Sequence, residues 1–218
     1  MIVLGIDGAL GAFSAAVARD GAIVAEASES GNVALESGLS IVGRVMADAG
    51  AAASDLDRVA AGCGPGGFTG LRIAISYAKS LAQAWQRPLV PVDSFDLLEY
   101  GSQRNPVLTV VVGRPGVISA RYRDGSHSMR ASGWIAAVLD ELDPALRSTA
   151  DLAVIGAPED VLCALAERGM VAHPHTTLVA PAASAAALVA SSREPAASVH
   201  AVRADYGELP AARVPRLK

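Results

Sequence analysis

Residues 2–30 read IVLGIDGALGAFSAAVARDGAIVAEASES, and the order of strands within them sets the fold class. The run Ile2–Asp7 is apolar and rich in β-branched side chains, and Phe13–Arg19 follows it after a short Gly/Ala turn. Asp20-Gly21 is a strong two-residue hairpin signal, and Ala22–Ser28 continues behind it. The stretch therefore predicts three consecutive antiparallel strands.

Beyond these strands, helices alternate with short strands. Apolar residues from Leu35 to Ala49 recur at helical spacing and stop before Gly50, which predicts a helix. The unit of residues 1–104 is then β-β-β-α-β-α-β-α, the order of the ribonuclease-H-like lobe in the actin/sugar-kinase superfamily. We predict an α/β protein with an actin-like (ASKHA) fold, in which two lobes of mixed sheet are flanked by helices. The other elements predicted in this first lobe are a strand Arg58–Ala61, a loop Gly62–Gly67, a helix Leu71–Trp85, a strand Leu89–Val92 and a helix Phe95–Tyr100 capped by Ser94.

A second, smaller and degenerate lobe is predicted over residues 105–192. Asn105-Pro106 breaks the pattern, and Val107–Val112 and Val117–Tyr122 then read as a hairpin. The tail, residues 193–218, is rich in Pro, Ala and Arg, so we expect it to be irregular. Weaker elements of the second lobe are a helix near Trp134–Leu142, a strand Leu152–Ile155, a helix Glu159–Glu167 and an Ala-rich helix around Ala183–Ala190.

Composition narrows the class of function. The chain has 218 residues, a net charge of −4 and an isoelectric point near 5.5, which gives no basic field for binding nucleic acid unaided. The N-terminus has no basic segment ahead of its apolar run, and no apolar run is long enough for a membrane span. Cys63 and Cys163 are far apart and outside any CxxC pair, which argues against a disulfide framework or a zinc site. We expect a cytoplasmic protein with no membrane partner.

The loop Gly62-Cys63-Gly64-Pro65-Gly66-Gly67 fits the G-x-G-x-x-G pattern, follows a strand and opens a helix, as a dinucleotide-binding loop does. Three features argue against that function. The candidate ribose ligand, Asp93, lies too far along the chain, three antiparallel strands are the wrong beginning for a Rossmann unit, and Pro65 lacks an amide that a phosphate would need. A Walker A loop is excluded because no lysine follows Gly67.

We interpret these glycines as structural, because they allow a sharp turn and close packing of the helix start. Phe68 in a loop, followed by Leu71 and Ile75 near the start of a helix, is also what a helix-to-helix interface needs. The segment is thus expected to serve the fold and to bind a partner, with no nucleotide.

At this loop the sequence resembles a known family. Residues 64–73, GPGGFTGLRI, are similar to the G-P-G-S-F-T-G-L-R-I segment of the TsaB (YeaZ) family. Ile6-Asp7-Gly8-Ala9 resembles the I-D-T-A/S opening of that family, and Pro91-Val92-Asp93-Ser94 resembles its strand-to-helix segment. The second half is similar only in size and element order, with Asp205-Tyr206 echoing a tyrosine motif near the C-terminus of the family.

This resemblance implies a subunit, not itself catalytic, of the bacterial machinery that places threonylcarbamoyl on N6 of the adenosine next to the anticodon of tRNA. Such a subunit resembles the catalytic TsaD subunit in fold, pairs with it through first-lobe helices, recruits the TsaE ATPase and forms homodimers when alone. It meets tRNA only indirectly, through the complex, and needs no cofactor. The residues that we predict at the partner interface are Leu39, Val42, Met46, Pro65, Gly66, Gly67, Phe68, Thr69, Gly70, Leu71, Arg72, Ile75, Ala78, Lys79 and Ala82.

The residues that a nucleotide-using member of the superfamily needs are incomplete here. Asp7-Gly8 remains as a weak candidate for holding phosphates and Mg²⁺, but Val112-Gly113-Arg114-Pro115 has no acid where the second lobe would supply one. TsaD relatives hold metal with a His pair, and many TsaB relatives keep a His near Ala34. The region Asn32–Ser40, where both features would lie, contains no His.

Other reactive side chains favour ordinary roles. His173 and His175 bracket Pro174 in a predicted surface loop, where an adventitious pair is favoured over a metal site. Cys63 is interpreted as a small buried hydrophobe, not a reactive thiol. We therefore predict no catalytic residue and no metal ligand. The rival hypothesis is an ATP- or dinucleotide-binding enzyme that uses Asp7 or the loop that starts at Gly62.

Overall fold

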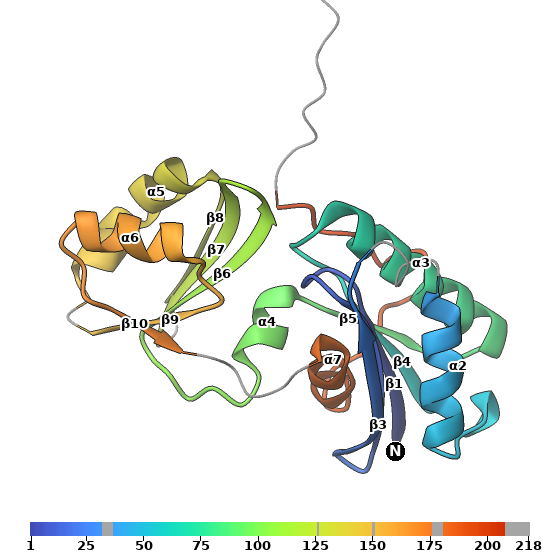
Figure 1. Cartoon of the computed structure of the whole chain (residues 1–218). Coiled ribbons are helices and arrows are strands. Elements are labelled where there is room, and N and C mark those ends of the chain that lie inside the picture. The colour runs from blue at the N-terminus through green and yellow to red at the C-terminus, as the bar shows by residue number, and fades with distance from the viewer. Residues whose placement is uncertain (32–36, 126, 150, 176–180, 208–218) are drawn as a thin grey trace, which may run out of the picture.

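The computed structural model describes residues 1–31, 37–125, 127–149, 151–175 and 181–207. Two five-stranded sheets, each flanked by helices, form two lobes (Figure 1). The predicted α/β class with two mixed sheets is confirmed.

The first sheet has the strand order β3-β2-β1-β4-β5. β1 to β3 pair antiparallel, whereas β4 and β5 run parallel to β1 because helices connect them. The predicted bounds of β1, β2 and β5 are confirmed, and β3 and β4 each extend one residue further. The strands are β1 (Ile2–Asp7), β2 (Phe13–Arg19), β3 (Ala22–Glu29), β4 (Arg58–Gly62) and β5 (Leu89–Val92).

Helices cover both faces of the first sheet, because successive side chains of its strands point to opposite faces. α2 (Gly38–Asp48) and α3 (Phe68–Trp85) pack on the face to which Leu4 points (Figure 1). α7 (Ala182–Ala190) packs on the face to which Val3 points. The short 3-10 helix η1 (Ala53–Asp55) lies between α2 and β4 in the chain.

The Ala-rich helix α7 lies on the first sheet, although the sequence-based division placed it in the second lobe. Its backbone lies directly on β1, since a Cβ added at Gly5 would overlap the carbonyl oxygen of Ala183. The Ala183 amide donates to Ser14 Oγ at 3.2 Å. The sequence of an apolar helix with small side chains does not indicate which sheet the helix will cover. The order of elements along the chain therefore assigned α7 to the wrong sheet.

The start of one helix and the capping residue of another differ from the prediction. α3 begins at Phe68, three residues before the predicted Leu71. In α4 (Ser94–Glu99), the capping residue is Asp93 and not Ser94. Asp93 Oδ1 accepts hydrogen bonds from the amides of Phe95 and Asp96, at 2.8 and 3.4 Å. The predicted start of the earlier helix, Leu35, lies outside the described residues, within which α2 begins at Gly38.

The second sheet has the strand order β10-β9-β6-β7-β8. Helices α5 (Ile135–Arg147) and α6 (Glu159–Glu167) cover one face and bury a second core there (Figure 1). The bounds of β9 and α6 match the prediction, while β6 and β7 each run two residues longer. The strands are β6 (Val107–Arg114), β7 (Val117–Asp124), β8 (His127–Trp134), β9 (Leu152–Ile155) and β10 (Ala172–His175).

The strands at the two edges of this sheet are not expected from the sequence. β8 is mostly exposed, so it lacks the alternation of apolar and polar residues that marks a half-buried strand. β10 has four residues and contains Pro174, which only an edge strand tolerates readily. The prediction that His173 and His175 lie in a surface loop is therefore wrong, because both belong to β10.

The described part of the tail has no helix or strand, as expected, but it packs along the first lobe. The Ala196 amide donates to the Leu89 carbonyl at 2.9 Å, and the Asp205 amide donates to the Cys63 carbonyl at 2.8 Å. Val202, between them, is buried in the first core. Tail residues beyond Gly207, including Arg213, Arg216 and Lys218, lie outside the described residues. No helix in the described ranges is both long and apolar enough to cross a membrane.

Candidate partner surface and the cleft between the lobes

The glycine-rich loop between β4 and α3 is packed onto the turn that follows β1. The Gly67 amide donates to the Ala9 carbonyl at 2.8 Å, and the Cys63 amide donates to the Val92 carbonyl at 2.7 Å. A Cβ added at Gly70 would overlap the carbonyl oxygen of Gly8. These amides serve the fold, so they are not free to hold the phosphates of a nucleotide.

The same loop makes room for the tail. Gly64 has φ +94°, a left-handed conformation that favours glycine, and a Cβ there would overlap the carbonyl oxygen of Asp205. On the far side of the tail, a Cβ at Gly207 would overlap Ser119 Oγ of β7. The tail residues 205–207 therefore lie between the loop and the second sheet.

Asp7, the weak candidate for a phosphate and Mg²⁺ site, is fully buried. Its Oδ1 accepts from the amides of Ala9 and Leu10 at 3.1 and 3.3 Å. Its Oδ2 has no hydrogen-bond partner among the described residues, and a Cβ at Gly62 would overlap it. Burial raises the pKa of the Asp7 carboxyl to about 6, although the backbone amides oppose the rise. Asp7 thus orders the β1–β2 turn.

Much of the predicted partner interface faces the core of the protein itself. The helical periodicity of α2 and α3 marks side chains that pack on the sheet, as in any amphipathic helix of a globular protein. A partner cannot contact these residues while the chain is folded. The predicted interface residues that are buried are Val42, Met46, Pro65, Gly66, Leu71, Ile75, Ala78 and Ala82. Those that are exposed or half-buried are Leu39, Gly67, Phe68, Thr69, Gly70, Arg72 and Lys79.

An exposed aromatic patch lies at the start of α3 and consists of Phe68, Arg72 and Tyr206. Phe68 is 56% exposed and Tyr206 is 40% exposed. Their ring centroids are 5.1 Å apart, and the Arg72 guanidinium carbon lies 5.1 Å from the Phe68 centroid. Leu39, on the neighbouring helix α2, is 52% exposed. Exposed rings of this size with an arginine beside them are typical of protein interfaces. Tyr206 was noted in the sequence only as an echo of a family motif.

Ion pairs join the two lobes across the cleft, which sequence reasoning missed. The Arg121 guanidinium of β7 lies 2.6 Å from Asp96 and 2.9 Å from Glu99, both on α4. Arg123 also pairs with Glu99, at 3.0 Å, and Arg193 of the tail pairs with Asp96 at 2.5 Å. Burial acts to raise the pKa of the Asp96 carboxyl, but Arg193 and Arg121 together hold it below its ordinary value. Protein carboxylates and guanidinium groups therefore occupy this part of the cleft.

The remaining residues that the sequence singled out for possible reactivity or metal binding have structural surroundings of their own. Gly113 is exposed near the end of β6, and beside it the Arg114 guanidinium stacks on the Trp134 ring at 5.0 Å. Cys63 is buried, and burial raises the pKa of its thiol to about 12, so the thiol stays neutral near pH 7. Among the described residues no group of His, Cys, Asp and Glu is arranged to hold a metal ion. Ala34, where many TsaB relatives have a His, lies outside them.

Comparisons with known proteins give a matching family model and related sequences. A family model described as TsaD, tRNA N6-adenosine threonylcarbamoyltransferase, matches residues 34–202. An uncharacterized protein of Mycobacterium tuberculosis is 36% identical over 114 residues, which is 52% of this chain and 51% of that protein. The tRNA threonylcarbamoyladenosine biosynthesis protein TsaB of Escherichia coli is 31% identical over 112 residues, 51% of this chain and 48% of that protein. The chain thus spans about half the length of these curated relatives.

A solved structure shares the fold. YeaZ from Pseudomonas aeruginosa superimposes with a TM-score of 0.68 at 23% identity, over 94% of this chain and 99% of that one. The two-lobed fold expected from the element order is therefore confirmed over nearly the whole chain.

Proposed function

Because the chain belongs to the tRNA N6-adenosine threonylcarbamoyltransferase (TsaD) family and has Escherichia coli TsaB among its homologues, we propose that it is a non-catalytic partner subunit of the machinery that makes N6-threonylcarbamoyladenosine on tRNA. The observation that carries this proposal is how the loop between β4 and α3 is used. The Cys63 and Gly67 amides and Asp7 Oδ1 form hydrogen bonds within the fold, while Phe68 at the end of the same loop faces solvent.

The aromatic patch is the proposed contact with the catalytic TsaD subunit. Leu39 on α2 is a further exposed apolar side chain of the first lobe, and Thr69 lies exposed beside Phe68. Ring packing in the centre and an arginine at the margin suit a helical partner surface that offers an apolar hollow and a carboxylate. We propose that the isolated chain uses this surface to form a homodimer, that the assembly recruits the TsaE ATPase, that tRNA is met only through the complex, and that the protein acts in the cytoplasm.

The patch is tested by a matched pair of substitutions. Phe68→Ser should weaken binding to TsaD by about 30-fold or more, because a central aromatic contact is typically worth about 2 kcal/mol. Trp134→Ser is the control, because Trp134 is 59% exposed and carries a stacked arginine of its own, Arg114, but lies on the second lobe. Affinity is measured by calorimetry with the purified full chain. Equal loss in both variants, or no loss in Phe68→Ser, would place the interface elsewhere.

The rival function, an ATP- or dinucleotide-binding enzyme, is favoured by one observation, the unpaired Oδ2 of Asp7. Calorimetry with ATP–Mg²⁺ and with NAD separates the two hypotheses, since micromolar binding by the isolated chain would support the enzyme. Reconstituted tRNA modification provides the second test. Product should form with TsaD, TsaE and a threonylcarbamoyl-AMP synthase only when this chain is present, and should still form with Asp7→Asn.

A further inference from the structure

The face of the second sheet that is turned away from α5 and α6 carries a row of basic and polar side chains. Strand register places five residues side by side across the sheet in each of two rows, with a histidine at the β10 end, arginine on β7 and apolar residues on β9. The first row is His175, Ile155, Thr109, Arg121 and Arg130. The second row is His173, Ala153, Val107, Arg123 and Ser128.

At the β7–β8 end of these rows, acids of the first lobe neutralise the cations. Glu99 accepts from Arg121 and Arg123, and Arg130 lies 2.6 Å from Asp93. A buried or half-buried guanidinium needs such partners, because leaving it unpaired costs several kcal/mol. The arginines in this half of the face are therefore paired with carboxylates of the protein.

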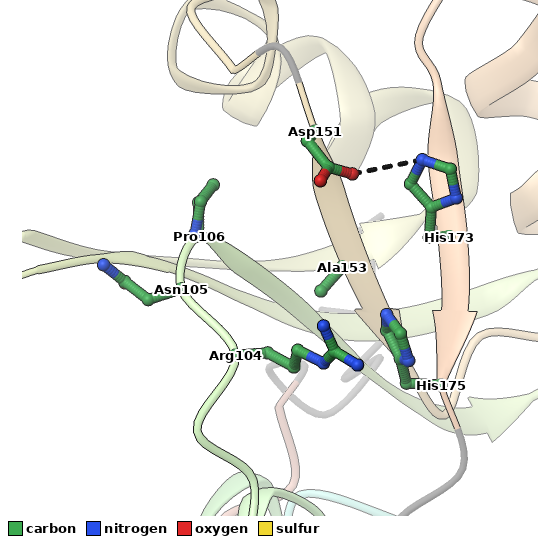
Figure 2. A pocket seen from close by; sticks show the side chains of 7 residues that line it. All are labelled: Arg104, Asn105, Pro106, Asp151, Ala153, His173 and His175. Carbon is green, nitrogen blue, oxygen red and sulfur yellow. Dashed lines mark ion pairs between the residues drawn. The ribbon is translucent and has the colours of Figure 1, made fainter.

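At the β10 end the face opens into a pocket of about 320 Å³ with no comparable set of acids. Its lining side chains include Arg104, His173 and His175, and Ala153 forms part of its wall (Figure 2). Among the described residues that line it, Asp151 is the only one with a carboxylate. The volume lies at the lower end of the roughly 300–1,000 Å³ range of small-molecule sites.

Two donors in this pocket, Arg104 and His175, point toward each other (Figure 2). Figure 2 shows the Arg104 side chain extending from the segment before β6 toward His175, while His173 faces Asp151. His173 Nε2 lies 3.1 Å from Asp151 Oδ1, which fixes the orientation of that ring and leaves Nδ1 as its other polar atom. Within the described ranges the Arg104 guanidinium makes no ion pair or hydrogen bond. An arginine guanidinium beside an imidazole is a donor set suited to the oxygens of a phosphate.

We propose that this pocket binds the phosphate group of a small phosphorylated molecule, held by Arg104 and His175 and bordered by His173. A bound phosphate would supply negative charge to the basic side chains at the β10 end of the rows. At the other end, carboxylates of the first lobe supply that charge. The Asp151 carboxylate would repel a phosphate. The carboxylate contacts His173, so its negative charge lies next to the His173 ring. The site lies on the second lobe, so it does not depend on the proposed partner contact at Phe68.

The histidine ring signals of the full chain provide the test. The sequence contains four histidines, of which His127 and His200 lie outside the pocket and serve as internal controls. Inorganic phosphate and pyrophosphate are titrated at constant ionic strength and constant pH. We expect saturable shifts of the His173 and His175 rings alone. Equal shifts of all four rings, or none at about 10 mM pyrophosphate, a concentration at which even very weak sites fill, overturn the proposal.

Substitutions identify the donor. Arg104→Gln should weaken pyrophosphate binding about tenfold or more, since a charged two-pronged contact is lost. Arg44→Gln is the control, because Arg44 is an exposed arginine of α2 that pairs with Glu29. Unchanged binding in Arg104→Gln would remove Arg104 from the site and refute the proposal. If a short RNA shifts His173 and His175 at lower phosphate concentration than pyrophosphate does, the pocket is a nucleic-acid contact and the small-molecule assignment is wrong.

Discussion

Asp7 is a carboxylate that the fold buries while satisfying only one of its oxygens. Two backbone amides bind Oδ1, and Oδ2 lacks a hydrogen-bond partner in the described part of the chain. The negative charge therefore costs free energy in the folded state, which is why burial raises its pKa to about 6. Sequence reasoning singled out Asp7 for its place before Gly8, but its burial depends on the loop that starts at Gly62, far along the chain.

The pH dependence of stability follows from this shift. The folded pKa lies above the unfolded value of 3.8, so the protein should be most stable below pH 3.8 with respect to this group and lose stability as pH rises through about 6. The loss is on the order of 3 kcal/mol. Asp7→Asn keeps the accepting oxygen and removes the charge, so its unfolding free energy should lack this decline.

Urea unfolding at several pH values between 4 and 8 measures the effect. Asp124→Asn, at the exposed end of β7, is the control and should retain the decline. The same slope in Asp7→Asn and Asp124→Asn would show that another group causes it.

At the scale of elements, the contact between α7 and β1 depends on the absence of a side chain at Gly5. Gly5→Ala should destabilise the protein by about 2 kcal/mol or more, because its Cβ would overlap the Ala183 carbonyl and push the helix away from the sheet. Gly43→Ala is the matched control within α2, where an added Cβ meets nothing within 4 Å. That variant should gain about 0.5–1 kcal/mol from helix propensity. Thermal unfolding of both measures the difference, and equal behaviour would contradict the packing of α7.

Most elements of the fold were predictable where local pattern and burial agree. β1, β2, β5 and β9 are almost continuously apolar and bounded by turn residues, so their limits are correct. β8 and β10 are edge strands that the sheet recruits by backbone pairing, and their side chains give no periodic signal. The sheet that α7 covers depends on small residues far along the chain, such as Gly5, which no local window contains.

About half of the residues predicted at the partner surface are buried, and the reason is physical. Helical periodicity identifies the apolar face of α3, but the same periodicity describes a helix packed on its own sheet. Leu71 and Ile75 are core residues, whereas Phe68, Thr69 and Arg72 at the helix start are exposed. Whether an apolar face is core or interface depends on tertiary contacts, which one sequence does not contain.

At the scale of the whole molecule, the Glu99 carboxylate holds the lobes together. It accepts from Thr109, Arg121 and Arg123 and is almost buried. Glu99→Gln should lower the free energy of unfolding by about 3 kcal/mol, because a nearly buried guanidinium loses its partner charge. Asp143→Asn breaks an exposed pair with Arg147 and should change stability little. Urea unfolding at low salt compares them. A Glu99→Gln cost no larger than that of Asp143→Asn would mean that the network does not join the lobes.

The position of α7 also affects how the chain folds as it is made. A ribosome delivers β1 to β5 long before residues 182–190, so one apolar face of the first sheet stays uncovered while the whole second lobe is synthesised. Small side chains line much of that face, including Ala18 and Ala60. They limit the apolar surface area that is exposed until α7 has been synthesised. The first lobe is completed last, by a helix that arrives after its neighbour has already formed.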